Sequence, residues 1–339
     1  MKKRNLKVDT LRGLACIMLV AYHVIGDSSG SGLKIDSGWY RQINDTFAYV
    51  RMPLFTFISG VVYAYRPFNG DFVRFLKGKF NRVLVPMLTL GTLFAIVQSL
   101  TPGANGGDFN WKLLHIIPVA HFWFVEAIFI IFVIVSVLEY MKLLSKPLTY
   151  LMVYICASAI FLTHVTVPYF SIQGAAYLMP YFLTGLAVQR FNLLDKIPSY
   201  VGGAMALGVL LYLTAIMFGY FELDGRTSLQ GLICGAVFCT GALALGAESE
   251  SLARIGYYSF TIYLLHVFFT SAVRIFMYKL GITNVHAVFL MAWIAGIFGP
   301  IIAEIVLDGT NFTRQYLLGK RKAESKDLWI SRFASKTNN

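Results

Sequence analysis

Charged residues are scarce in this chain of 339 amino acids, of which only 14% are Asp, Glu, Lys or Arg. Soluble globular domains carry about 25% charged residues. Hydrophobic residues make up 57% of the sequence, and its mean hydropathy is +0.64. Because too little polar surface is available to cover a water-soluble core, this composition excludes an ordinary soluble domain and indicates that the bilayer is the solvent.

Cysteine motifs and phosphate-binding motifs are also lacking. The four cysteines lie inside apolar runs, without the spacing of a disulfide framework or a metal site, so we expect no metal. The sequence has no phosphate-cradling glycine loop and no Gly-x-Ser-x-Gly elbow. The net charge of +12 could suggest nucleic acid, but in a membrane protein it marks the cytoplasmic side. We therefore expect no nucleic-acid partner.

Long apolar runs fill most of the chain, and only helices and closed barrels satisfy their backbone in lipid. The runs are continuous, without the alternation of barrel strands. The predicted fold class is all-α: a polytopic transmembrane helix bundle of about ten spans. The first run resembles a signal peptide but ends in no clean cleavage site, so we predict a retained span. The spans are expected near residues 10–26, 47–65, 83–100, 119–138, 148–163, 172–189, 200–218, 229–246, 257–276 and 285–307.

Lysine and arginine are distributed unevenly between the loops on the two sides of these spans. With ten spans, 21 of the 29 lie on the side of both termini, five lie on the other side, and three lie within or beside spans. This bias follows the positive-inside rule and predicts that both termini are cytoplasmic. We expect residues 1–310 to form the transmembrane domain and residues 311–339 a basic cytoplasmic tail, partly disordered.

Ionisable residues in the spans are few, and the first span is the richest in them. Such residues are costly in lipid and usually face a cavity or a partner. Asp9 or Thr10 is expected to cap the helix, and Arg12 follows Asp9 at a spacing that allows pairing. His23 comes eleven residues after Arg12, so the two share one helix face about 16 Å apart along the axis. In the alternative interpretation, Arg12 snorkels to the interface and His23 is an interfacial histidine.

Further charged residues flank the second and fourth spans. Lys79 and Arg82 lie in a basic loop, which is either ordinary positive-inside charge or a site for an anionic, phosphate-bearing ligand. Glu126 lies several residues into the fourth span and needs a partner, and Arg51, at the outer edge of the second span, is the one we expect. The small pair Ser59-Gly60 predicts close helix packing.

The ninth and tenth spans also carry polar groups. Ser259, Tyr263 and His266 have the spacing of one helix face. His266 is either a functional group or a hydrogen-bonded packing histidine. Glu304, near the cytoplasmic end of the last span, is expected to reach water.

Taken together, these segments resemble the acyltransferase 3 family, the integral-membrane O-acyltransferases of bacterial surface glycans. The family's Arg-x10-His pair corresponds to Arg12 and His23, with Asp9 before it. Lys79 departs from the family's arginine, and Met52-Pro53-Leu54-Phe55 is similar to the fucose O-acetyltransferase branch. The resemblance covers residues 6–307, and its other motifs correspond to Phe55, Phe57, Ser59 and Gly60; to Lys79, Arg82 and Pro86; to Trp123 and Phe124; and to Ser259, Tyr263 and His266.

The resemblance implies a membrane-bound O-acyltransferase of the bacterial cytoplasmic membrane. It would move an acyl group, usually acetyl, from acyl-CoA to a hydroxyl of a cell-surface polysaccharide or its lipid-linked precursor. The partners implied are acetyl-CoA as donor, a glycan acceptor and the lipid bilayer. The acceptor sugar and the oligomeric state are not predicted.

Residue roles follow from the same resemblance. His23 is expected to act as general base, with Arg12 and Asp9 in the catalytic group, or to carry the acyl group covalently. The CoA phosphates are expected at Arg12, Lys79 and Arg82, and the acceptor side at Arg51, Trp123, Glu126, Tyr263 and His266. A competing function is a transporter or flippase of a lipid-linked glycan, whose basis is that polar groups line a membrane cavity. No inverted repeat supports it.

Overall fold

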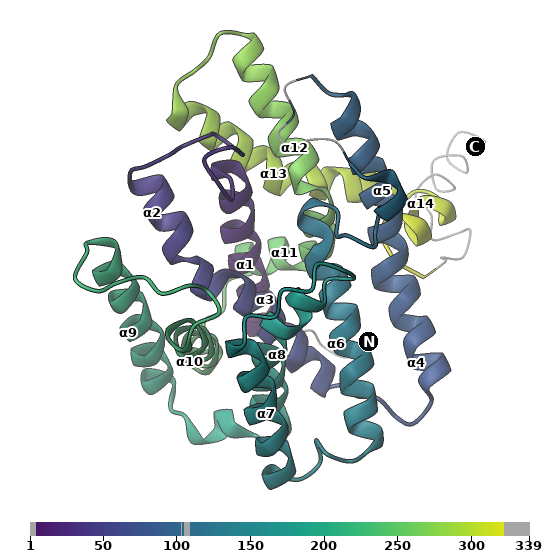
Figure 1. Cartoon of the computed structure of the whole chain (residues 1–339), viewed down its shortest axis with the longest axis vertical. Coiled ribbons are helices and arrows are strands. Elements are labelled where there is room, and N and C mark those ends of the chain that lie inside the picture. The colour runs from purple at the N-terminus through teal and green to yellow at the C-terminus, as the bar shows by residue number, and fades with distance from the viewer. Residues whose placement is uncertain (1–4, 103, 105–108, 322–339) are drawn as a thin grey trace, which may run out of the picture.

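The computed structural model describes residues 5–102, 104 and 109–321, and these form helices without a β-strand (Figure 1). The α-helices are α1 (Leu6–Ile25), α2 (Trp39–Thr46), α3 (Ala48–Ala64), α4 (Phe72–Lys79), α5 (Val85–Leu100), α6 (Trp123–Tyr140), α7 (Pro147–Leu162), α8 (Ile172–Arg190), α9 (Ser199–Met217), α10 (Leu229–Leu245), α11 (Glu250–Tyr257), α12 (Ser259–Lys279), α13 (Val285–Leu307) and α14 (Asn311–Tyr316). A π-helical turn, η1 (Phe80–Leu84), joins α4 to α5, and short 3-10 turns include η3 (Ala120–Phe122).

Each of the ten expected spans corresponds to one helix of the described chain. Within the described part of the chain, seven segments are long and apolar enough to cross a membrane, and α7 and α10 are shorter apolar helices. The predicted all-helical, polytopic bundle is therefore confirmed. The exact number of crossings and the side of the termini stay predictions.

Short helices and one helix cap differ from the sequence-based expectation. The expectation omitted α2, α4, α11 and α14, which have eight residues or fewer and therefore too few turns for a clear hydrophobic period. The expected cap at Asp9 or Thr10 is wrong, because α1 begins one turn earlier at Leu6. The side chain of Asn5 accepts a hydrogen bond from the Val8 amide and caps the helix.

Buried helices form the centre of the bundle and more exposed helices surround it. In α1, in the segment Trp39–Ala64 and in the segment Ala120–Tyr140, more than 60% of the residues in the most apolar window are buried, whereas in α9 and α13 only 28% are. Figure 1 shows α9 with α10, α4 with α5, and α12 with α13 arranged around α1 and α3. The central helices therefore carry the side chains that lipid does not contact.

Glycines allow a close helix crossing in this centre, between α3 and α8. A Cβ atom added to Gly60 would lie 2.1 Å from the Phe182 carbonyl oxygen, and one added to Gly185 would lie 2.0 Å from the Phe57 carbonyl oxygen. Both distances are far inside van der Waals contact, so only glycine fits at either position. The close packing predicted from Ser59-Gly60 is confirmed.

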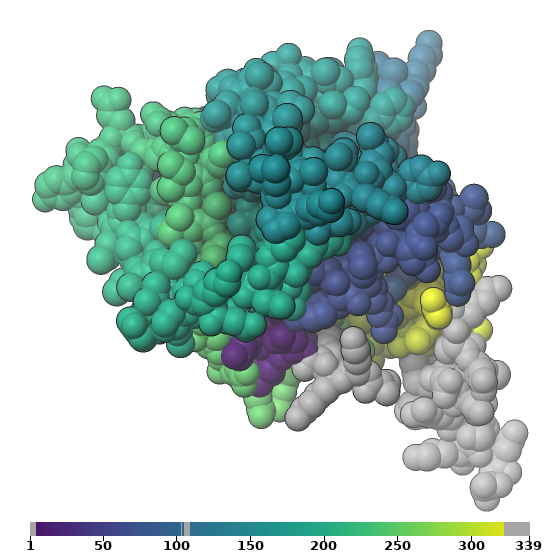
Figure 2. All heavy atoms as spheres, turned by 90° about the horizontal axis from the view of Figure 1, so that it is seen from below, coloured from purple at the N-terminus to yellow at the C-terminus, as the bar shows by residue number. Residues whose placement is uncertain are grey.

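The C-terminal segment folds back onto the bundle. Helix α14 packs against α5 and η1 (Figure 2, yellow beside blue). Lys320 forms ion pairs with Glu304 at 2.7 Å and with Asp308 at 3.0 Å. Glu304 is only 4% exposed and also accepts a hydrogen bond from Thr261, so the expectation that it reaches water is wrong. Residues 322–339 of the predicted tail lie outside the described residues.

Candidate functional site

Two cavities lie at different levels along α1. The larger, of about 1180 Å³, lies at the C-terminal end of α1, where His23, His121 and Trp123 are among its lining residues. We call it the histidine cavity. The smaller, of about 380 Å³, lies at the N-terminal end and is called the basic cavity. Its lining residues are Arg12, Ser59, Val62, Tyr63, Tyr65, Arg66, Lys79, Arg82 and Phe132.

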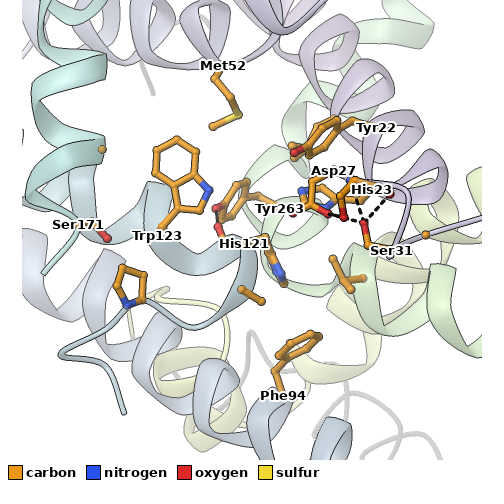
Figure 3. Close-up of a pocket in the computed structure, with 18 of the residues that line it drawn as sticks. Tyr22, His23, Asp27, Ser31, Met52, Phe94, His121, Trp123, Ser171 and Tyr263 are labelled. Atoms are coloured by element: carbon orange, nitrogen blue, oxygen red, sulfur yellow. Dashed lines mark hydrogen bonds between the residues drawn. The ribbon is translucent and has the colours of Figure 1, made fainter. Parts of the chain in front are cut away.

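Three imidazoles from separate elements meet beside the histidine cavity. The ring centroids of His23 and His266 are 4.8 Å apart, those of His121 and His266 are 4.9 Å apart, and those of His23 and His121 are 5.7 Å apart. His23 comes from the last turns of α1, His121 from η3 and His266 from α12. Figure 3 shows His23 and His121 reaching the same space from opposite sides, with Tyr263 and Trp123 next to them. We call these three residues the histidine cluster.

Hydrogen bonds assign the tautomers of the two buried members. Nδ1 of His266 lies 2.8 Å from the Ile262 carbonyl oxygen and 2.9 Å from that of Tyr263, and carbonyls only accept, so Nδ1 carries the proton. Nε2 of His121 faces the Leu264 carbonyl oxygen at 3.4 Å and is protonated by the same argument. The opposite nitrogens, Nε2 of His266 and Nδ1 of His121, are buried and have no hydrogen-bond partner among the described residues. Each neutral ring therefore presents a free lone pair.

His23 is the cluster member best placed for chemistry. It is partly exposed and lines the histidine cavity, whereas His266 is fully buried behind it. A base that opens on a cavity, backed by an imidazole with a free lone pair, is suited to accept a proton and share it. Among the described residues, no group of three or more His, Cys, Asp and Glu side chains has the geometry to hold a metal ion.

Four cations converge on the basic cavity. The π-helical turn η1 carries Arg82, and Lys79 precedes it by three residues, so both point to the same side as Arg12 and Arg66. Lys79 Nζ lies 3.6 Å above the Phe132 ring, which holds the ammonium at the cavity wall. Arg12 forms the predicted ion pair with Asp9 at 3.1 Å. The cavity therefore offers positive charge for a ligand with several phosphates.

An aromatic partition separates the two cavities along the bundle. On α3, Met52 lines the histidine cavity and Ser59 lines the basic cavity, and the nearly buried Phe55 lies between them. The Phe55 ring packs on Phe124 of α6 at 6.0 Å, and Phe124 packs on Tyr263 at 5.2 Å. These buried rings therefore lie at a level of the bundle between the two cavities.

Of the residues predicted for the acceptor side, three line the histidine cavity, whereas Glu126 and His266 do not. Arg51, Trp123 and Tyr263 line the histidine cavity, and the hydroxyl of Tyr263 donates to the His121 carbonyl. The predicted pairing of Arg51 with Glu126 is wrong. Glu126 instead accepts a hydrogen bond of 2.5 Å from Ser171, which lines the cavity. Glu126 therefore holds a residue of the cavity wall in place.

Sequence reasoning missed three residues of these sites. His121 directly precedes the Phe-Trp segment of the fourth span, which is the available signal, but its position beside a predicted membrane boundary indicates no particular role. In the sequence, Arg66 is one of several cytoplasmic charges. Arg226, in the loop before α10, lines the histidine cavity, and neither spacing nor composition indicates that.

Comparison with known protein families gives a match over most of the chain. A family model described as an acyltransferase domain, that of the acyltransferase 3 family, matches residues 5–308, which is nearly all of the bundle. No curated protein matches the chain, and no solved structure matches it.

Proposed function

The chain belongs to the acyltransferase 3 family and is a multi-pass membrane acyltransferase, and we propose that it O-acylates a glycan from acyl-CoA. The acceptor is a hydroxyl of a cell-surface polysaccharide or of its lipid-linked precursor, and the acyl group is acetyl. The membrane is the bacterial cytoplasmic membrane. The observation that carries this proposal is the placement of the histidine cluster and the basic cavity at two levels of one bundle.

The basic cavity is the proposed site for the phosphates of the donor. Arg12, Lys79 and Arg82 were selected from the sequence for this role, and they line one cavity together with Arg66. Arginine binds phosphate as a bidentate fork and lysine as a point charge. With the N-terminus in the cytoplasm, this cavity opens to the side on which acyl-CoA is made.

His23 is the proposed general base in the acyl transfer. It accepts the proton of the acceptor hydroxyl as the oxygen attacks the thioester carbonyl. The new C–O bond forms as the C–S bond breaks, and the proton passes to the departing thiolate. The His266 ring packs against His23 with centroids 4.8 Å apart, and its buried Nε2 has no hydrogen-bond partner among the described residues. In this proposal a turn of either ring lets Nε2 accept a hydrogen bond from His23 while His23 holds the proton. Asp9, paired with Arg12, holds that guanidinium at the donor end.

Access of the donor to His23 depends on the aromatic partition. The arm that links the phosphates to the thioester is long and thin, and the two cavities lie about 16 Å apart along α1, measured from Arg12 to His23. In this proposal the rings of Phe55 and Phe124 turn aside when the arm enters. A covalent acyl-His23 is the second chemical route, in which the cluster receives the acyl group before the acceptor arrives.

The test is acyl transfer by purified protein in nanodiscs with radiolabelled acetyl-CoA and a panel of sugars. The proposal expects saturable acetyl-CoA binding, and label on at least one sugar together with stoichiometric release of CoA. Folded protein that neither binds acetyl-CoA nor releases CoA would refute it and favour the glycan transporter.

A further inference from the structure

A buried arginine in the histidine cavity has no carboxylate partner among the described residues. Arg51 is only 5% exposed. Its Nη1 makes one long contact, 3.5 Å, to the Asn44 carbonyl oxygen, and its Nε has no hydrogen-bond partner. The nearby Asp45 pairs with Arg41 at 3.6 Å. Burying a cation without a paired anion costs free energy, so such a cation in a membrane protein marks a functional position.

The Tyr22 ring contacts both the Arg51 guanidinium and His23, the proposed base. The Arg51 Cζ lies 3.7 Å above the Tyr22 ring centroid. The Tyr22 ring in turn packs edge-on against the His23 imidazole, with centroids 4.7 Å apart. The Arg51 guanidinium, whose Nε has no hydrogen-bond partner, is therefore separated from His23 by the Tyr22 ring alone.

Arginine predominates among the charged residues that line the histidine cavity. Its described charged residues are three arginines, Arg51, Arg226 and Arg274, and one aspartate, Asp27. Arg226 stacks over the Tyr177 ring at 5.5 Å, and Asp27 already accepts hydrogen bonds from serines of its own loop. Arg51 and Arg226 form no ion pair with a described carboxylate, so these two arginines can present positive charge to a ligand in the cavity.

We propose that the acceptor is anionic, and that Arg51 and Arg226 bind a carboxylate or phosphate close to the hydroxyl that is acylated. This inference rests on the proposed function, because it names the acceptor class of the same site. A guanidinium binds either anion through paired hydrogen bonds. Trp123, on the opposite side of the cavity from Tyr22 (Figure 3), offers a flat apolar face for the sugar ring.

The experiment compares three acceptor probes with the full-length protein in nanodiscs: methyl glucuronide, glucose 6-phosphate and methyl glucoside. For the wild type we expect the half-saturating concentration of at least one anionic probe to be tenfold or more below that of the neutral probe. Arg51→Gln and Arg226→Gln should each remove most of this preference. Lys279→Gln is the matched control, because it removes an exposed cation that lies after the last turn of the cavity-lining part of α12.

Two readouts separate failure of this inference from failure of the proposed function. Acetyl transfer reports on both, whereas quenching of tryptophan fluorescence by the probes, checked with Trp123→Phe, reports on binding alone. The inference is supported if the wild type binds an anionic probe selectively and Arg51→Gln abolishes this selectivity. Comparison of methyl glucuronide with glucose 6-phosphate then shows whether the anion is a carboxylate or a phosphate. Equal binding of the neutral and anionic probes by wild type, or equal losses for both in Arg51→Gln, would overturn it even if acetyl transfer occurs.

Discussion

Replacing Lys79 by methionine isolates the charge that the basic cavity presents to the donor. The Lys79 ammonium lies over the Phe132 ring, and a methionine of similar length can place its thioether against the same ring, so the change removes the charge and keeps an apolar contact. The contact of Lys79 with a phosphate is a hydrogen bond between charged groups, which contributes about 1.5–3 kcal/mol. Because Lys79 is only partly buried, we take the lower value, about 1.5 kcal/mol, which corresponds to roughly a tenfold change in affinity.

The expected effect of Lys79→Met lies in KM for acetyl-CoA. The phosphates bind equally in the ground state and the transition state, so kcat should stay near the wild-type value while KM rises roughly tenfold. The assay is the initial rate of CoA release at varied acetyl-CoA concentration. The ratio of KM values should shrink when the donor lacks its 3′-phosphate, if Lys79 contacts that group.

Arg254→Gln is the matched control for this measurement. Arg254 lies on α11, which packs against the N-terminal half of α1, and its side chain is 81% exposed and does not line the basic cavity. Its removal should leave KM unchanged. Unchanged KM in Lys79→Met and in Arg82→Gln, with folded protein, would refute the assignment of the donor phosphates to this cavity.

Three further changes test other parts of the account. Phe124→Ala opens the aromatic partition and should raise CoA release without acceptor by several-fold, measured as free thiol. His266→Gln should lower kcat by roughly 10²-fold, and change its pH profile, with KM for acetyl-CoA unchanged, because the proton held by His23 loses its second acceptor. Gly185→Ala places a methyl group against the Phe57 carbonyl and should destabilise the fold by about 1–3 kcal/mol, seen as a lower thermal midpoint in detergent.

Residues that repeat along one helix could be placed from the sequence. Each of the ten apolar runs predicted a helix that the structure contains, and the eleven-residue spacing placed Arg12 and His23 on one face, where they line the two cavities. Pairing between neighbours on a helix was equally accessible, as Asp9 and Arg12 show. These features depend on helix geometry, which the local sequence determines.

Contacts between distant segments could not be placed in this way. The partner of Glu126 is Ser171, 45 residues away, and nothing in either segment indicates it. The histidine cluster joins residues from three elements, and one of them, His121, stands on a 3-10 turn at a boundary where periodicity gives no direction. Tertiary packing determines these contacts, and the residues around each partner do not indicate which distant segment will pack against it.

The most direct test of the central claim is the turnover of His23→Ala in nanodiscs, measured as acetyl-CoA-dependent CoA release and compared with wild type and His286→Ala. His286 is the matched control, because it bonds to Tyr40 and does not line the histidine cavity. His23→Ala is expected to lose kcat by at least roughly 10²-fold while it still binds acetyl-CoA, and His286→Ala is expected to keep its activity. Wild-type turnover in folded His23→Ala would show that His23 is not the general base.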